Sequence, residues 1–157
     1  MGYIEEYFHK KSEDIVEMDI SSFIEQKVQE CLTLDYKDFQ KFDDPDGLSE
    51  HISAFANSTG GLLILGIREV ENYPTEITWG DLRRKTRESL ENRLLSRIYP
   101  KIDGMRIIPI YKTGSTNEGI FLIDIPQGFN PPYMAGDKKY YKRLNFQKQP
   151  MEGSVLH

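Results

Sequence analysis

The chain has 157 residues, a formal net charge of −5 and 38% hydrophobic residues. This length suits one domain with its own core, and the charge argues against a protein that attracts polyanions by net positive charge alone. No apolar run approaches the roughly 18 residues of a membrane span, and the N-terminus lacks a signal pattern, so we expect no membrane partner and a cytoplasmic location. The single cysteine excludes an internal disulfide and a cysteine-built metal site.

Charge is distributed unevenly along the chain. Residues 1–50 carry 14 acidic and five basic side chains, whereas residues 51–157 carry 11 acidic and 15 basic ones. A surface that binds a polyanion is therefore expected in the second part, with the acidic first part held away from it or folded over it.

The N-terminal third predicts a weakly patterned arm followed by a helix and a strand. Residues 1–20 fit either a short helix or a flexible arm, which would serve in interactions or in a homodimer contact. Ser22 with Glu25 three residues later resembles a capping box and predicts a helix that ends near Glu30. Residues 32–39 alternate between apolar and polar side chains, which predicts a half-buried strand.

The stretch from Asp44 to Gly66 predicts a helix, a glycine turn and a central strand. Asp44 followed by Pro45 favours a helix start, and apolar residues at helical spacing continue to residue 56. Residues 57–61 favour a turn, because their side chains are small or compete for backbone groups. Residues 62–65 are all apolar, which is typical of a strand buried on both faces, and Gly66 interrupts that run.

The remaining residues predict one long helix and three strands. A loop over residues 69–79 precedes a helix over residues 81–98, which Pro100 ends. Strands are expected over residues 106–111, 120–125 and 139–144. The pattern lacks strict alternation of strands and helices, so we predict a single α+β domain with a mixed sheet. Its expected limits are residues 21–151, between the N-terminal arm and a tail over residues 152–157.

Residues 54–67, with the sequence AFANSTGGLLILGI, resemble the signature of the Schlafen AlbA-like domain. Three further matches follow the order of that family: Glu30 with Leu34, Asp35, Tyr36 and Lys37; the strand from Ile120 to Pro126; and Pro132 with Tyr140, Tyr141, Lys142 and Arg143. The resemblance implies helices packed on a mixed sheet and a domain often described as DNA-binding or ATP-binding. It also implies a relation to RNA-cleaving Schlafen proteins that use three carboxylates.

Two carboxylates, Glu30 and Asp35, are expected at one rim because a turn separates them. Crowded carboxylates favour a shared proton or a divalent cation such as Mg²⁺ or Mn²⁺. By resemblance they fall on the first two catalytic positions of the ribonucleases, and Glu69 or Glu71 falls on the third. The alternative is that Glu30 faces solvent and Asp35 pairs with a neighbouring cation.

The glycine turn is a second candidate site. Backbone N–H groups around Asn57, Thr59, Gly60 and Gly61 are expected to contact phosphate oxygens. No P-loop pattern is present, and the turn precedes a strand rather than a helix. The alternative is a tight turn that lets the helix pack on the sheet.

Cations interleaved with aromatic rings form the third candidate site. On a strand, Lys139, Tyr141 and Arg143 share one face and Lys142 the other, and the basic helix residues Arg83, Arg84 and Arg87 extend the patch. Rings stack on bases and cations neutralise phosphates. The alternative is an edge strand protected by lysines and a solvated helix face.

Together these patterns favour a domain that binds DNA or RNA with low sequence specificity, in a regulatory role. The first alternative is a metal-dependent endoribonuclease that uses Glu30, Asp35 and Glu69. The other is a domain that binds ATP or another protein. The preferred hypothesis requires Arg143 and the cationic residues 83–87 to share a groove with the carboxylates.

Overall fold

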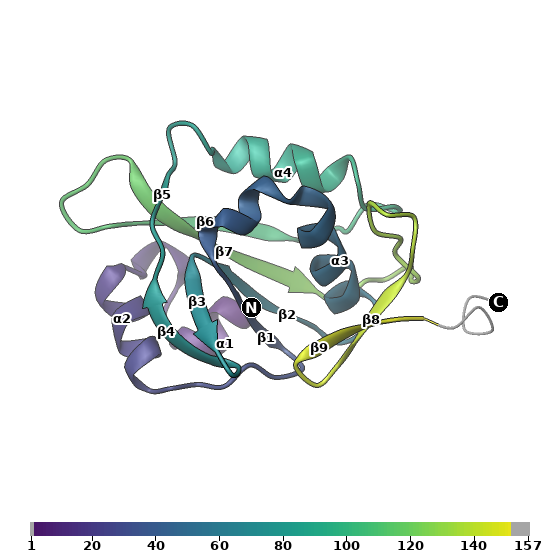
Figure 1. The fold of residues 1–157 in the computed structure, drawn as a ribbon, viewed down its shortest axis with the longest axis horizontal. Helices are drawn as coiled ribbons and strands as arrows, with labels where there is room; N and C mark the ends of the chain where they lie inside the picture. The colour runs from purple at the N-terminus through teal and green to yellow at the C-terminus, as the bar shows by residue number, and fades with distance from the viewer. Residues whose placement is uncertain (1, 152–157) are drawn as a thin grey trace.

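The computed structural model describes residues 2–151 as a mixed β-sheet between two layers of helices (Figure 1). The main sheet has the order β1–β2–β7–β6. Strands β1 and β2 are parallel, and the other pairs are antiparallel. The strands of this sheet are β1 (Leu34–Lys37), β2 (Gly60–Leu65), β5 (Gly80–Asp81), which also pairs with β7, β6 (Arg106–Tyr111) and β7 (Glu118–Pro126). The expectation of a single α+β domain with a mixed sheet is confirmed.

Two hairpins and six helical segments complete the fold of residues 2–151. The hairpins are β3 (Ile67–Val70) with β4 (Tyr73–Ile77), and β8 (Tyr141–Leu144) with β9 (Gln147–Pro150). The helices are α1 (Tyr3–Phe8), α2 (Glu17–Glu25), α3 (Pro45–Ala56) and α4 (Arg87–Leu95), with the short 3-10 helices η1 (Ser12–Asp14) and η2 (Phe39–Asp43). Among the described residues, no helix is both long and apolar enough to cross a bilayer.

Strand β2 is buried on both faces, as its apolar run predicts. Leu63 and Leu65 join the core cluster that contains residues of α3 and α4. Leu62 and Ile64 join a second cluster, which contains residues of α1 and α2. The strand therefore separates two hydrophobic cores, one on each face of the sheet.

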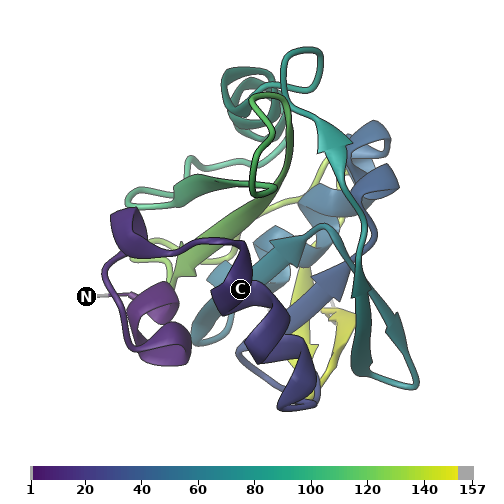
Figure 2. The same ribbon diagram turned by 90° about the vertical axis from the view of Figure 1, so that its left-hand side faces the viewer.

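Helix α3 begins where the sequence predicts. The Asp44 carboxylate accepts a hydrogen bond from the Gly47 N–H at 3.0 Å, and Pro45 occupies the first turn. Its buried side chains include Leu48, Ile52 and Phe55, which pack on the sheet. The two helical layers lie on opposite sides of the sheet in the second view (Figure 2).

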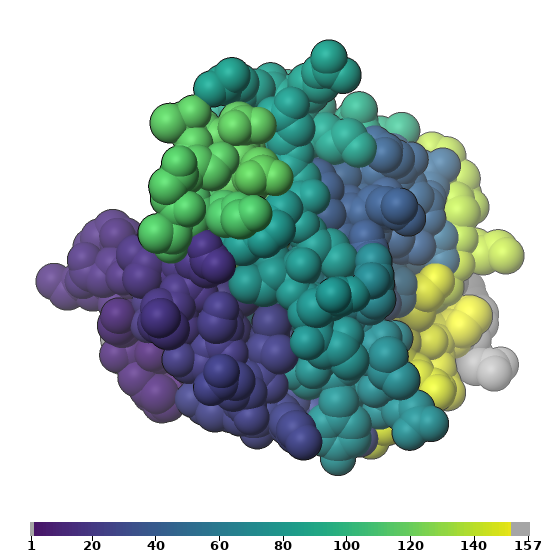
Figure 3. Space-filling view, turned by 60° about the vertical axis from the view of Figure 1, so that its left-hand side comes forward, coloured from purple at the N-terminus to yellow at the C-terminus, as the bar shows by residue number. Residues whose placement is uncertain are grey.

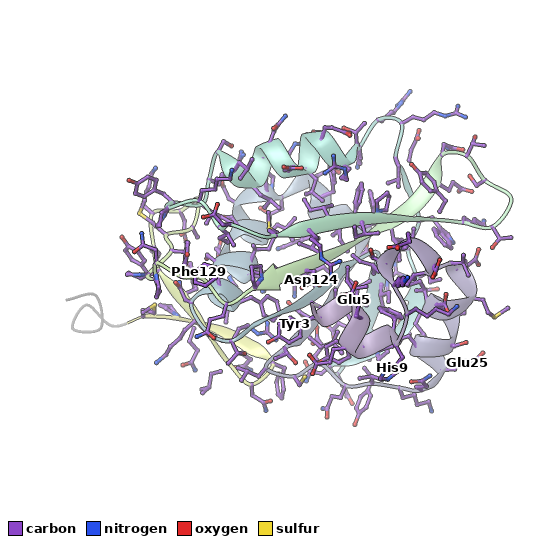
Figure 4. All side chains as sticks on the ribbon, turned by 180° about the vertical axis from the view of Figure 1, so that it is seen from behind. Tyr3, Glu5, His9, Glu25, Asp124 and Phe129 are labelled. Carbon is purple, nitrogen blue, oxygen red and sulfur yellow. The ribbon has the colours of Figure 1, made fainter. Side chains whose placement is uncertain are left out.

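The N-terminal segment is folded against the domain. Ile4 of α1 is fully buried, and its N–H donates to the Asp124 carboxylate at 3.1 Å. Arg106 donates hydrogen bonds to the Glu5 and Asp124 carboxylates, each at 2.6 Å. Glu5 on α1 and Asp124 on β7 are labelled in Figure 4. Of the two expectations for this segment, the structure shows a helix.

Three predicted elements have different bounds in the structure, and the predicted loop over residues 69–79 contains strand β4 of the β3–β4 hairpin. Helix α2 begins at Glu17 instead of Ser22, because the Asp19 carboxylate accepts from the Val16 N–H at 2.9 Å, and it ends at Glu25, short of Glu30. The long helix is shortened to Arg87–Leu95, since residues 82–86 form a turn and the Thr86 hydroxyl caps the helix. Strand β8 begins at Tyr141 instead of residue 139. The predicted tail, residues 152–157, lies outside the described residues.

Candidate nucleic-acid interface

Glu30 and Asp35 meet at the edge of the sheet. Asp35 lies on β1 with its carboxylate on the α3 side, whereas its neighbours Leu34 and Tyr36 enter the opposite core. The Glu30 carboxylate accepts from the Tyr36 N–H at 2.9 Å and is hydrogen-bonded to Asp35. Both residues are buried, so Glu30 does not face solvent as the alternative interpretation requires.

Asp35 is surrounded by basic groups from three elements. Its carboxylate lies 3.4 Å from Lys37 Nζ on β1, 3.5 Å from His51 Nδ1 on α3 and 3.5 Å from Arg143 Nη1 on β8. Arg143 also donates to the Cys31 carbonyl oxygen at 2.6 Å and lies 4.3 Å from the centroid of the Phe55 ring. The side chain of Arg143 is fully buried, so it fastens β8 to β1 and α3.

The shared environment sets different protonation states for the two carboxyl groups. Burial, followed by the hydrogen bond and the negative charge of Asp35, raises the pKa of Glu30 to about 9. Burial would raise the pKa of Asp35 as well, but the hydrogen bond from Glu30 and the charges of Lys37 and Arg143 bring it below its usual value. Near neutral pH, Glu30 is therefore the proton donor and Asp35 the charged acceptor.

His51 contributes no charge to this cluster near neutral pH. Burial is the main reason that its pKa falls to about 3. The cluster then holds one carboxylate charge against the two cations of Lys37 and Arg143. A divalent cation would have to displace both cations and the proton of Glu30, so the residues as arranged do not fit the predicted Mg²⁺ or Mn²⁺ site.

The third predicted ligand, Glu69, is adjacent but used elsewhere. Its carboxylate accepts from the Asn72 N–H at 2.8 Å, and the Asn72 carbonyl oxygen accepts from the Glu30 N–H at 2.8 Å. The β3–β4 turn is thereby fixed beside Glu30 while the Glu69 carboxylate stabilises that turn. Within residues 2–151, no three side chains of the metal-ligating types form a group that could hold an ion.

The glycine turn forms hydrogen bonds with other parts of the chain. The Asn57 side chain donates to the carbonyl oxygens of Tyr133 and Tyr141, at 3.0 and 2.8 Å, and accepts from the Tyr133 N–H at 2.6 Å. The Thr59 carbonyl oxygen accepts from the Tyr3 hydroxyl at 2.6 Å.

Neither glycine of the turn has room for a side chain. Gly60 has a φ of 80°, and a Cβ there would come within 2.5 Å of the Ile125 carbonyl oxygen, while one on Gly61 would meet the Phe55 ring at 2.4 Å. This packing favours the interpretation of a tight turn between helix and sheet.

The residues predicted on β8 do not share one exposed face. Tyr141 and Arg143 point inward, and Lys142 and Leu144 point outward. Lys139 precedes the strand and is exposed. Tyr141 and Arg143 share one side of the strand, as expected, but that side is buried. The expected binding surface of Lys139, Tyr141 and Arg143 is therefore wrong, and only the lysines remain at the surface. Figure 3 shows the β8–β9 segment beside the blue segment that includes α3.

The basic residues before and in α4 lie elsewhere. Arg83 donates to the Thr116 hydroxyl, and Arg87 pairs with Glu91 at 2.8 Å, whereas Arg84 is exposed. Their loop is separated from the β8–β9 hairpin in both ribbon views (Figures 1 and 2). The expected groove shared by Arg143 and these residues is not formed, so the form of the nucleic-acid hypothesis that requires this groove is wrong, and a binding surface would have to use other cations.

Sequence reasoning missed two residues of the buried cluster. His51 has no metal-ligand spacing, and Phe55 appears only as a core residue of the helix. The two are four positions apart on α3, so they lie on one side of that helix and both approach the Asp35–Arg143 pair. That spacing was the available signal, but the sequence does not reveal what faces it.

Comparisons with known proteins agree with this fold. A solved structure, the DIP2311 protein from Corynebacterium diphtheriae, is similar with a TM-score of 0.56 and 15% identity. The match covers 85% of this chain and 26% of that protein, so the chain spans about a quarter of its length. A comparison with curated protein sequences gives no match. A sequence model described as Schlafen, AlbA_2 matches residues 30–152, which include β1, the glycine turn and β8. The chain therefore belongs to the Schlafen AlbA_2 family.

Proposed function

We propose that this protein binds nucleic acid through exposed lysines on and beside the β8 strand. Lys138, Lys139 and Lys142 are exposed, and none of them forms an ion pair within residues 2–151. Lysines without carboxylate partners are free to neutralise phosphates, and this contact is independent of base sequence. This unpaired cationic surface is the observation that carries the proposal.

In this proposal the buried cluster around Asp35 and Arg143 holds the lysine surface in place and does not catalyse a reaction. Arg143 fixes the inward side of β8 to Asp35 and to the Cys31 carbonyl oxygen. The outward side of the same strand then presents Lys142 from a fixed backbone. The geometry therefore favours a binding protein over the metal-dependent endoribonuclease and over an ATP-binding turn.

The test is a salt titration of binding to labelled DNA and RNA oligonucleotides by fluorescence anisotropy. We expect the logarithm of the association constant to fall linearly with the logarithm of salt concentration. A triple variant, Lys138→Gln with Lys139→Gln and Lys142→Gln, should reduce that slope by about 2 on single strands, at about 0.7 for each phosphate contact.

Lys11→Gln is the matched control, since Lys11 is exposed in the acidic N-terminal part of the chain. It removes one positive charge, as each of the three substitutions does, and should leave the slope unchanged, whereas each single substitution of the triple variant should lower it by about 0.7. Equal slopes for the wild type and the triple variant, or no binding to any oligonucleotide at low salt, would reject the proposed function.

A further inference from the structure

Three separate segments form a short ladder next to the lysines. Tyr99 and Met134 exchange both backbone hydrogen bonds, at 3.1 and 2.7 Å, and Met134 forms an antiparallel bridge with Tyr140 in turn. Side chains directly opposite each other in antiparallel pairs lie on one face, with Cβ atoms roughly 5 Å apart. Tyr99, Met134 and Tyr140 therefore form a row of side chains, which we call the Tyr99 row.

The Tyr99 row faces solvent. The side chain of Tyr99 is 73% exposed, and Met134 and Tyr140 are partly exposed. Their chain neighbours Ala135 and Tyr141, which point the other way, are buried against Ala54 of α3. Two tyrosine rings are thus held outward by a backbone that is anchored from beneath.

The surroundings of the row are cationic. Lys142 lies two positions after Tyr140 and points to the same side of the strand, and Lys138 and Lys139 precede Tyr140. Lys101 lies two positions after Tyr99 and is also exposed and without an ion pair in the described part of the chain. The carboxylate within this stretch, Asp137, accepts from the Tyr141 hydroxyl and the Lys139 N–H.

We propose that the Tyr99 row binds the unpaired bases of single-stranded nucleic acid while the lysines around it contact the phosphates. The inference rests on the proposed function and specifies its substrate. Bases in a duplex have their faces covered by stacking, so only a single strand offers them to an exposed ring. A purely electrostatic surface would need the lysines alone and would leave no role for two outward tyrosines joined in one row.

The test compares one labelled oligonucleotide of 12 nucleotides, as a single strand and annealed to its complement, with wild type and variants. We expect the wild type to bind the single strand more than tenfold tighter than the duplex. Tyr99→Ala should weaken single-strand binding about 5- to 150-fold, from about 1–3 kcal/mol for each stacked base, and change duplex binding little. Tyr140→Ala should act in the same direction.

Two further variants separate stacking from a general loss of structure. Tyr99→Phe keeps a ring and should bind the single strand as tightly as the wild type. The thermal unfolding of Tyr99→Ala and Tyr99→Phe should match that of the wild type, because the Tyr99 side chain is exposed. Tyr111→Ala is the matched control, since Tyr111 is 46% exposed on β6 and lies outside the row. The salt slope of Tyr99→Ala should equal that of the wild type, because no cation is removed.

The two proposals fail in different ways. Salt-dependent binding that the lysine variant weakens, together with equal affinity for single strand and duplex and no effect of Tyr99→Ala, would overturn the stacking site and leave the proposed function intact. Absence of binding to either form at low salt would overturn both.

Discussion

Each side of strand β8 carries a basic residue, but one side is buried and the other is exposed to solvent. On the inward side, Arg143 has its side chain fully buried and pairs with Asp35. On the outward side, Lys142 is exposed and without an ion pair among the described residues. The charge of Arg143 is therefore committed to the fold, whereas that of Lys142 is free for a ligand. The side of the strand on which a cation lies, and not its residue type, therefore decides whether it can bind a phosphate.

The largest expected effect tests the inward side. Arg143→Ala removes one cationic partner of the Asp35 carboxylate. It also removes the hydrogen bond to the Cys31 carbonyl oxygen and the contact with the Phe55 ring. We expect a loss of about 3–5 kcal/mol in the free energy of unfolding, measured by urea denaturation. Lys142→Ala, one position away, should change it by less than about 0.5 kcal/mol. Equal losses would show that parity does not separate the two cations.

A second substitution tests how the outer surface is held in place. Asn57→Ala leaves two carbonyl oxygens and one N–H, belonging to Tyr133 and Tyr141, without their partner. Unfolding experiments should show a loss of about 2–4 kcal/mol, because buried backbone groups lose hydrogen bonds. Asn92→Ala on the exposed side of α4 is the control and should have little effect. A neutral Asn57→Ala would mean that the C-terminal segment is anchored by other contacts.

The smallest expected effect, counted for one pH unit, is a pH dependence of the inner cluster. The pKa of Glu30 rises from 4.5 to about 9 on folding, so the folded chain holds an extra proton between these values. Stability should therefore fall as the pH rises through this window, by at most about 1.4 kcal/mol for each pH unit. The lowered pKa of Asp35 acts only below its ordinary value of 3.8 and stays outside the window.

Glu30→Gln keeps a neutral donor next to Asp35 and removes the titrating group. Urea midpoints measured at pH 6, 7 and 8 should decline in the wild type and decline less in this variant. Glu25→Gln, on the exposed end of α2, should follow the wild type. Parallel curves for all three proteins would contradict a protonated Glu30 in the folded state.

The central part of the fold could be predicted from the sequence, since local signals and burial agree there. The apolar run of β2 and the capping Asp44 before Pro45 correspond directly to elements of the structure. The ends of the helices near Ser22 and Asp81 could not be placed. The Asp19 carboxylate caps an earlier turn, and the Asp81 carboxylate accepts from the Arg83 N–H and stabilises a turn before α4.

The candidate site was less accessible to prediction, because it depends on contacts between distant residues. The spacing of Glu30 and Asp35 predicts that the two carboxylates meet, and the structure brings them together. Nothing in the local sequence shows that Arg143, 108 positions after Asp35, will fill the space beside them. Tyr99 was missed for the same reason, because its ladder partner Met134 lies in a separate segment.

The core formed by α1 and α2 has a practical consequence for anyone who shortens this protein. The family match begins at residue 30, but Ile4, Ile15, Ile20 and Phe23 fill one side of the sheet together with Leu62 and Ile64. A truncation at the family boundary would remove α1 and α2 and expose an apolar face of the sheet to water. Such a fragment is expected to precipitate, so its failure to bind a ligand would carry no information about the intact molecule.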